Sequence, residues 1–168
     1  VVGHSSNDVY RAATDSLPRR RADVLFLDEH YRSHPQIIGF SNRYIYQHRL
    51  KIKKDQESNG RLPVASGVFR HNVIGTAERG PGGRSWMNHP EGAEVIKLVL
   101  SIKNGDAKSL SLGVVTPFAP QKNWLNKQLE SHSLQSEVLV DSAHGFQGDE
   151  REIMIFSPVI ARGITESA

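Results

Sequence analysis

Three features are missing from the sequence, and each absence excludes a class of protein or site. The chain contains no cysteine, so disulfides and thiolate metal sites are excluded; this fits a reducing cytoplasm, where we expect the protein to act. It has no apolar run near the length of a bilayer span and no signal-peptide pattern at its start, so we expect no membrane partner. It also lacks a GxxxxGKS or GxxxxGKT loop, so a phosphate-binding loop of that type is excluded within these residues.

The composition that is present is typical of a globular domain. A chain of 168 residues with 38% hydrophobic residues is long enough for one sizeable core, so we expect one domain. Its 21 Lys and Arg against 18 Asp and Glu give a net charge of +3, which permits a polyanionic partner without requiring one. The chain begins on Val1 rather than methionine and stops at Ala168 without a closing signal. We therefore expect a piece of a larger protein, truncated at both ends.

Residues 138–158 are the most informative stretch. Two short apolar runs, 138–140 and 153–156, have the length and composition of buried strands. Between them, Gly145 and Gly148 allow tight turns or close approach to a ligand. The loop also carries more polar side chains than a connector needs: Ser142, His144, Gln147, Asp149, Glu150, Arg151 and Glu152. Residue types alone leave open the alternative of a solvated loop between two core strands.

The string SAHGFQGDE at residues 142–150 carries a family resemblance. With the apolar strand and Ser157 that follow it, it resembles the fifth conserved motif of superfamily I helicases. The resemblance is to an AAA-type branch that has a Phe-Gln-Gly core, then an acidic and basic cluster, then a hydrophobic strand. A predicted strand on each side agrees with this identification.

A second family-like stretch begins at a predicted buried strand, residues 24–27, which ends at Asp28 and Glu29. This pattern also resembles the magnesium-binding strand of P-loop NTPases, but such a strand requires the phosphate-binding loop that is missing. The string HYRSHP at residues 30–35, followed by FSN at residues 40–42, resembles the fourth motif of the same helicase branch. That motif combines Tyr-Arg, His-Pro and a Phe-Ser-Asn element on a helix.

The helix after this motif is physically reasonable. Pro35 suits a first helical turn. One stripe of the helix is apolar and contains Ile37, Phe40, Tyr44 and Ile45. The spacing of His30 and His34 suggests a zinc pair, but a residue that precedes proline is kept out of the helical region, and no third ligand is evident.

Weaker patterns cover the first half of the chain. Residues 8–16 are expected to form a short helix and residues 68–69 a strand. Two basic groups are expected to be solvated surface, with phosphate contact as the alternative for the second. They are the arginines at 19, 20 and 21 and the lysines at 51, 53 and 54.

The second half has clear helical and strand patterns. A helix is predicted from Pro90 to near Gly105, with a buried stripe of Val95, Leu98, Val99 and Ile102. A strand is predicted at residues 112–116, and residues 117–121 open a further helix whose buried side uses Phe118, Leu125 and Leu129. The run GVVTPF at residues 113–118, with Gln121, again resembles the helicase branch, in which a strand ends in Thr-Pro-aromatic and a glutamine follows.

The order of these elements predicts the fold class. Strands alternate with helices, which indicates an α/β fold with a mostly parallel sheet and helices on both faces. In such sheets ligands lie beyond the carboxyl ends of the strands, where all three family-like motifs fall. By resemblance, residues 1–168 are the second RecA-like domain of a superfamily I helicase, a fold of the P-loop NTPase superfamily that here lacks its own P-loop.

The resemblance implies an ATP site. Tyr31 would stack on adenine, and Arg32 would present a planar fork to the γ-phosphate; the alternatives are a core tyrosine and a structural ion pair. Gln147 and Gly148 would approach the phosphates, with Gln147 in a catalytic role. Glu150 would accept a hydrogen bond from the ribose. Magnesium would accompany ATP, bound mainly by a first RecA-like domain of the same polypeptide.

The resemblance also implies a site for single-stranded DNA or RNA. Its residues would be Thr116, Pro117, Ser142 and His144, of which the three with polar side chains suit backbone phosphates. Ordinary loop capping by those three is the alternative. The family branch implies 5′-to-3′ movement. His30 stands where many relatives have Gln and Ser33 where many have Met, which leaves the choice between DNA and RNA open.

Two other functions are compatible with the residues. One is a non-catalytic nucleic-acid-binding module of the same fold. The other, ranked lower, is a magnesium nuclease that uses Asp149, Glu150 and Glu152. The late Thr-Arg-Ala-Arg motif of the family is absent, and the sequence around Arg162 does not match it.

Overall fold

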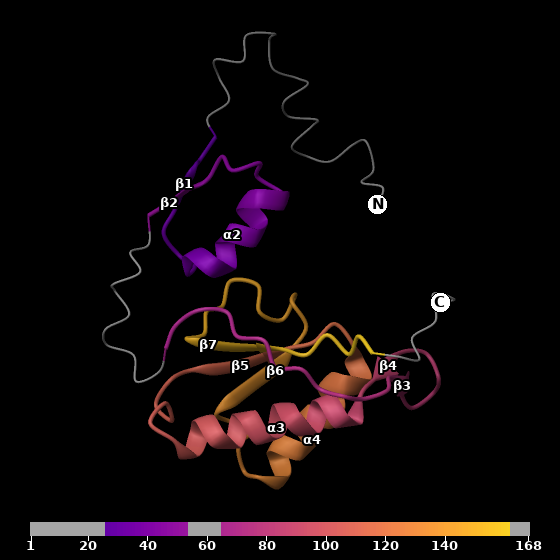
Figure 1. Cartoon of the computed structure of the whole chain (residues 1–168). Helices are drawn as coiled ribbons and strands as arrows, with labels where there is room; N and C mark the ends of the chain where they lie inside the picture. Colours follow the sequence, from indigo (N-terminus) through magenta and orange to yellow (C-terminus); the bar gives the residue numbers. More distant parts are fainter. Residues whose placement is uncertain (1–25, 54–64, 162–168) are drawn as a thin grey trace. The chain divides into compact units, whose positions relative to one another are not determined.

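The computed structural model describes residues 26–53 and 65–161, which belong to two compact units, Val1–Gly60 and Arg61–Ala168. Figure 1 shows the described segments in colour. Each unit is considered by itself. The predicted helix at residues 8–16, the arginine run at 19–21, Lys54 and Arg162 lie outside the described residues.

The described part of the first unit consists of two short parallel strands joined by a helix. Strand β1 (Glu29–His30) pairs with β2 (Lys51–Ile52), and helix α2 (Pro35–Tyr44) lies between them in the chain. The helix begins as predicted, with proline in its first turn. His34 is extended and caps the helix, because its Nδ1 accepts a hydrogen bond from the backbone of Gln36 at 3.3 Å. At the other end, the Asn42 side chain holds both backbone polar groups of Leu50, at 2.9 and 3.0 Å.

The first predicted strand is displaced. Its first two residues lie outside the described part, and β1 contains Glu29 and His30 rather than the apolar residues before them. Leu27 is 80% exposed. The pairing explains the shift, because the ladder begins where the backbone of Lys51 donates to Asp28. Lys51 and Lys53 are exposed, as predicted, and their side chains pair with Asp28 and Glu29.

The predicted apolar stripe of α2 is present on the helix but is not buried. A hydrophobic period specifies which face of a helix is apolar, but not what covers that face. Its members are each more than half exposed: Ile37, Phe40, Tyr44 and Ile45.

The second unit is built on a parallel sheet of three strands. Strand β5 (Leu112–Val115) is central, with β6 (Val138–Asp141) on one side and β7 (Ile153–Phe156) on the other. Both neighbours run parallel to it, with Leu112 opposite Val138 and Ile153. The strands predicted at 112–116, 138–140 and 153–156 are therefore confirmed, as is the parallel sheet.

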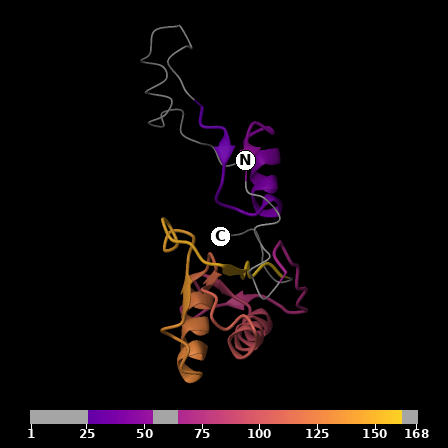
Figure 2. The same cartoon turned by 90° about the vertical axis from the view of Figure 1, so that its left-hand side faces the viewer.

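Two helices pack on this sheet, α3 (His89–Asn104) and α4 (Ala119–Ser131). Figures 1 and 2 show both on the same side of the strands. The core lies between them and the sheet, and its buried side chains are Val95, Ile96, Val99, Leu112, Val114, Leu125, Leu129, Val138 and Val140. The sheet flanked by helices is thus confirmed. Among the described residues of this unit, however, the helices cover one face rather than both. Side chains alternate between the faces of a strand, and Met154 and Phe156, which alternate with the core-facing residues of β7, are exposed.

Helix α3 has a slightly different buried stripe from the predicted one. Val95 and Val99 are buried as expected, but Ile96 is buried in place of Leu98, which is 40% exposed. Packing against both α4 and the sheet widens the buried face beyond a single stripe. In α4, Leu125 and Leu129 are buried as predicted, whereas Phe118 is half-buried and precedes the helix.

A small hairpin was missed by the sequence patterns. Strand β3 (Glu78–Arg79) pairs antiparallel with β4 (Trp86–Met87) across a glycine-rich turn. The strand predicted at Val68 and Phe69 is wrong, since both residues are irregular and exposed. Within the described residues, none of the helices combines the length and apolar character required to cross a membrane.

Candidate functional site

The carboxyl ends of β5 and β6 bring two predicted strand-binding residues together. Thr116 follows β5 and Ser142 follows β6. Asp141 joins them: its carbonyl accepts from the Thr116 backbone at 3.0 Å, and its carboxylate accepts from the Ser142 backbone at 2.6 Å. The motifs around Thr116 and Ser142 therefore meet at one edge of the sheet.

Asp141 is held in its charged form. Its pKa is lowered from the ordinary value, first by the hydrogen bond from Lys122 and then by the backbone N–H of Ser142. Lys122 Nζ lies 2.9 Å from the carboxylate. Gly145 allows the following loop to pass directly against this carboxylate, because a Cβ at position 145 would overlap it. Asp141 therefore organises the loop as well as the edge of the sheet.

Thr116 has an unusual side chain. It is 1% exposed, and its hydroxyl is the one buried side-chain polar atom in residues 26–53 and 65–161 that lacks a hydrogen-bond partner. Such groups are rare in native proteins and call for an explanation. Helix α4 has no side-chain cap, so the alternative that Thr116 is an ordinary loop cap is wrong. Pro117, the next residue, is exposed.

The loop after β6 is a series of turns. Backbone N–H groups of Gly145, Gln147 and Asp149 each donate to the carbonyl three residues earlier, at 3.0–3.1 Å. Phe146 anchors the loop, because its ring lies where a side chain at residue 113 of β5 would stand. Gly148 has a φ of 82°, which glycine adopts without strain. His144, Gln147 and Gly148 are exposed.

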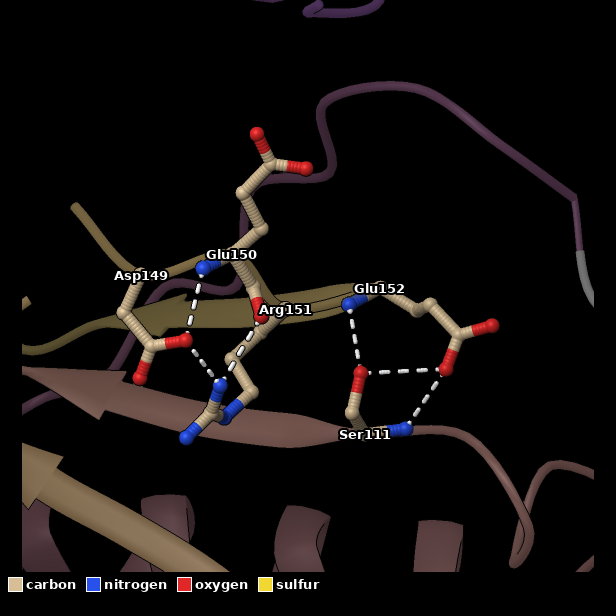
Figure 3. A network of polar contacts seen from close by, with 5 residues as sticks. All are labelled: Ser111, Asp149, Glu150, Arg151 and Glu152. Atoms are coloured by element: carbon tan, nitrogen blue, oxygen red, sulfur yellow. Dashed lines mark hydrogen bonds and ion pairs between the residues drawn. The ribbon is translucent and has the colours of Figure 1, made fainter.

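The acidic end of this loop does not gather its carboxylates. Figure 3 shows Arg151 bonded to Asp149, while Glu152 bonds to the hydroxyl and backbone N–H of Ser111. These contacts lower the pKa of Asp149, chiefly through Arg151, and the pKa of Glu152, chiefly through the Ser111 backbone. The Glu150 side chain points away from the others (Figure 3). In the described part of the chain, no group of three or more His, Asp or Glu residues is placed to hold a metal ion.

In the first unit, Tyr31 and Arg32 directly follow β1, and both are exposed. Tyr31 is 63% exposed, so the alternative of a core tyrosine is wrong. Its hydroxyl donates to Glu29, which raises the pKa of Tyr31. The zinc pair is not formed by the neighbouring histidines, because His30 Nε2 accepts from the Ser33 backbone at 2.9 Å and His34 caps α2.

A buried polar network in the second unit was not predicted. Gln121 is fully buried; its Oε1 accepts from the Asn88 backbone at 2.9 Å, and its Nε2 donates to Ser157 at 3.2 Å. Ser157 in turn donates to Glu91, which also accepts from the Val159 backbone at 3.0 Å. The spacing of Gln121 with Leu125 and Leu129 is the signal that places it on the buried face of α4. The network ties the starts of α3 and α4 to the end of β7.

Comparison with known proteins identifies one matching family model and several relatives. The model of a family described as "AAA domain" matches residues 10–167. The Danio rerio protein mov-10-B.1 is 29% identical over 92% of this chain and 17% of its own length. A "Regulator of nonsense transcripts 1 homolog" of Neurospora crassa is 27% identical over 77% of this chain and 13% of its own length.

A third relative, "Helicase SEN1" of Saccharomyces cerevisiae, is 26% identical over 96% of this chain and 8% of its own length. The chain therefore spans less than a fifth of the length of these curated relatives.

Proposed function

From the premise that this chain belongs to the AAA domain family of superfamily I helicases, we propose that it is the second RecA-like domain of an ATP-dependent helicase. Its fold is that of the RecA-like P-loop NTPases. In the intact protein, residues 1–168 would act together with a first RecA-like domain that supplies the phosphate-binding loop. This arrangement explains why the chain carries motifs that resemble those of a nucleotide-binding site but lacks the phosphate-binding loop.

The observation that carries the proposal is the edge formed by Thr116, Asp141 and Ser142. Two motifs that are distant in sequence meet there. One of them contains Thr116, whose buried side-chain hydroxyl has no hydrogen-bond partner among the described residues. Neutral donors at such an edge suit the phosphates of a single strand, since backbone contacts position nucleic acid without reading its sequence. We assign Thr116, Pro117, Ser142 and His144 to this strand-binding role.

The nucleotide-binding residues belong to the same proposal. Tyr31 offers an exposed ring for stacking on adenine. Arg32 presents a guanidinium to the γ-phosphate, where it stabilises the negative charge that develops in phosphoryl transfer. Gln147 and Gly148 lie in the exposed turns of the loop after β6, from which backbone and amide groups reach phosphates. Glu150 accepts from the ribose hydroxyl.

ATP is the substrate of this proposed motor, and its hydrolysis supplies the free energy for movement along the strand. Among the described residues, no group of three or more His, Asp or Glu is placed to hold a metal ion. We assign magnesium binding to the first domain. This chain would orient the nucleotide and bind the single strand.

A non-catalytic nucleic-acid-binding module is the second candidate, favoured by the missing phosphate-binding loop. The two candidate functions predict different effects of an Arg32 substitution on ATP hydrolysis by the intact protein. In a motor, Arg32→Ala should lower the rate of strand-stimulated ATP hydrolysis by roughly three to five orders of magnitude, as for other arginines that contact a γ-phosphate. Nucleotide affinity should fall much less. In a binding module, neither parent nor variant hydrolyses ATP.

The matched control is Arg43→Ala, which removes a second exposed arginine of the same unit whose guanidinium lies over Tyr44. Its hydrolysis rate should stay near that of the parent. Rates are compared with RNA and with DNA oligonucleotides as the stimulating strand. A variant at Arg32 that stays within a few-fold of the parent would show that Arg32 is structural and that the nucleotide site is misplaced.

A further inference from the structure

A lysine at the edge of the sheet is assigned no role by the family-like motifs. Lys122 lies in the first turn of α4, where its backbone N–H donates to Phe118 at 3.0 Å. Its side chain reaches back to the end of β6, and Nζ lies 2.9 Å from the carboxylate of Asp141. The side chain is 33% exposed. The ammonium is therefore fixed in position and still reachable from solvent.

The charge of Asp141 makes this lysine necessary at a phosphate site. The carboxylate is bonded to the Ser142 backbone, and the Thr116 backbone donates to the carbonyl of the same aspartate. An ionised carboxylate between two groups that bind phosphate would repel the strand. Lys122 cancels that charge. Its ammonium has three N–H donors, and the bond to Asp141 uses one of them.

On the basis of the function proposed above, we propose that Lys122 is a further strand-contacting residue. Its ammonium contacts a backbone phosphate of a single-stranded nucleic acid beside Thr116 while it stays paired with Asp141. Thr116 and Ser142 are neutral, so Lys122 is the cationic group that could contact a phosphate here, while it also balances the charge of Asp141. The hydroxyl of Thr116, at the same end of the strands, is buried and has no hydrogen-bond partner among the described residues, so it is a second polar group here whose donor is unused.

The salt dependence of strand binding tests the proposal. A cation that contacts a phosphate releases a counterion, whereas a neutral donor does not. In the intact protein without nucleotide, Lys122→Gln should weaken binding of labelled oligouridine or oligothymidine. It should also reduce the slope of log affinity against log salt by about 0.7, the value for one contact on a single strand. Lys122→Arg, which keeps the charge, should retain most of the slope.

Lys127→Gln is the matched control. Lys127 is an exposed lysine on the same helix, five residues further along, which places it about 7.5 Å down the axis and on a different face. The Lys127→Gln variant should keep both the strand affinity and the salt slope of strand binding near those of the parent. Oligouridine and oligothymidine are measured in parallel, so that a preference for RNA or DNA appears as a difference between the two titrations.

Asp141→Asn separates direct contact from a structural role. If Lys122 contacts phosphate, removal of the carboxylate takes away repulsion, and strand affinity should stay equal or rise. If Lys122 acts only through its ion pair, Asp141→Asn should weaken binding as much as Lys122→Gln does, which would overturn the proposal. An unchanged salt slope in Lys122→Gln would overturn it as well.

The combined variant Thr116→Ala with His144→Ala shows which proposal has failed. Loss of affinity in that variant, together with a parental slope in Lys122→Gln, rejects the role of Lys122 alone. Full affinity in both variants rejects the strand-binding edge itself and with it the proposed function.

Discussion

The hydroxyl of Thr116 is the clearest residue-level sign of a role beyond folding. A buried polar group without a partner destabilises a protein by about 1–3 kcal/mol, and this hydroxyl is such a group among the described residues. An apolar residue of similar shape would avoid that loss. In the proposed strand-binding role, a hydrogen bond to a phosphate oxygen would remove the penalty.

Glu150 and the neutral donors should affect different ligands. In the proposed function the Glu150 carboxylate would accept a hydrogen bond from a ribose hydroxyl but would repel phosphate, so Glu150→Ala should weaken ATP binding about tenfold or more. The affinity of the Glu150→Ala variant for a single strand, measured in the absence of nucleotide, should hardly change. Thr116→Ala with His144→Ala should do the reverse and uncouple hydrolysis from stimulation by the strand. Titration of both ligands against these variants of the intact protein provides the measurement.

Two controls accompany this comparison. Glu130→Ala removes another exposed glutamate, from the far end of α4, and should alter neither affinity. Because a threonine hydroxyl carries no charge, Thr116→Ala alone should leave the salt slope of strand binding nearly unchanged. Loss of strand affinity with retained ATP affinity in Glu150→Ala would mean that the two sites are assigned in reverse.

The sequence predicted where the candidate residues lie along the strands and loops better than it predicted the contacts that hold them, and their chemical roles stay predictions. The exposed ring of Tyr31 and the edge position of Thr116 agree with their motifs. The pairing of Asp141 with Lys122 spans 19 residues, and nothing local in the sequence specifies that partner. Long-range polar partners depend on the register of the sheet, which a single sequence does not state.

At the scale of elements, long periodic segments were predictable and short ones were not. Helix α3 has a clear apolar period and strands β5 and β7 are short continuous apolar runs, and their bounds agree closely with the prediction. Strands of two residues, such as β3 and β4, are too short for a period of two to appear. Val68 and Phe69 have strand-forming types, but both lie in irregular structure.

The buried glutamine of α4 should matter for the stability of the second unit. Gln121→Met keeps the helix and the approximate volume but leaves the buried backbone N–H of Asn88 without its acceptor. We expect the free energy of unfolding to fall by about 1–3 kcal/mol, the usual loss for an unsatisfied buried group. Urea unfolding of the 168-residue chain measures it through the fluorescence of Trp86 and Trp124, which both lie in this unit.

Gln128→Met is the matched control for this substitution. Gln128 lies on the same helix and is only half-buried, so its replacement should change the free energy of unfolding by no more than about 0.5 kcal/mol. Equal stabilities for Gln121→Met and Gln128→Met would show that the network around Gln121 does not hold α3, α4 and β7 together.

At the scale of the whole molecule, length predicted a single domain, while the chain divides into two compact units. The assignment of residues 1–168 to one RecA-like domain stays a prediction. Chain length indicates how many hydrophobic cores a chain can bury, but not where along the sequence the contacts between its parts are few. The alternation of strands and helices did predict the parallel sheet of the second unit.

The chain by itself should hydrolyse no ATP, with or without a single strand. In the proposed function Tyr31 and Arg32 would orient a nucleotide, but the sequence has no GxxxxGKS or GxxxxGKT loop to hold its phosphates. Phosphoryl transfer relies almost entirely on positioning and charge stabilisation, so a site without that loop should give no turnover. Steady-state phosphate release from the purified 168-residue chain, compared with the intact protein, measures this. Turnover that persists through purification and disappears in Arg32→Ala would show that the chain holds a complete nucleotide site, and the need for a first domain would then be wrong.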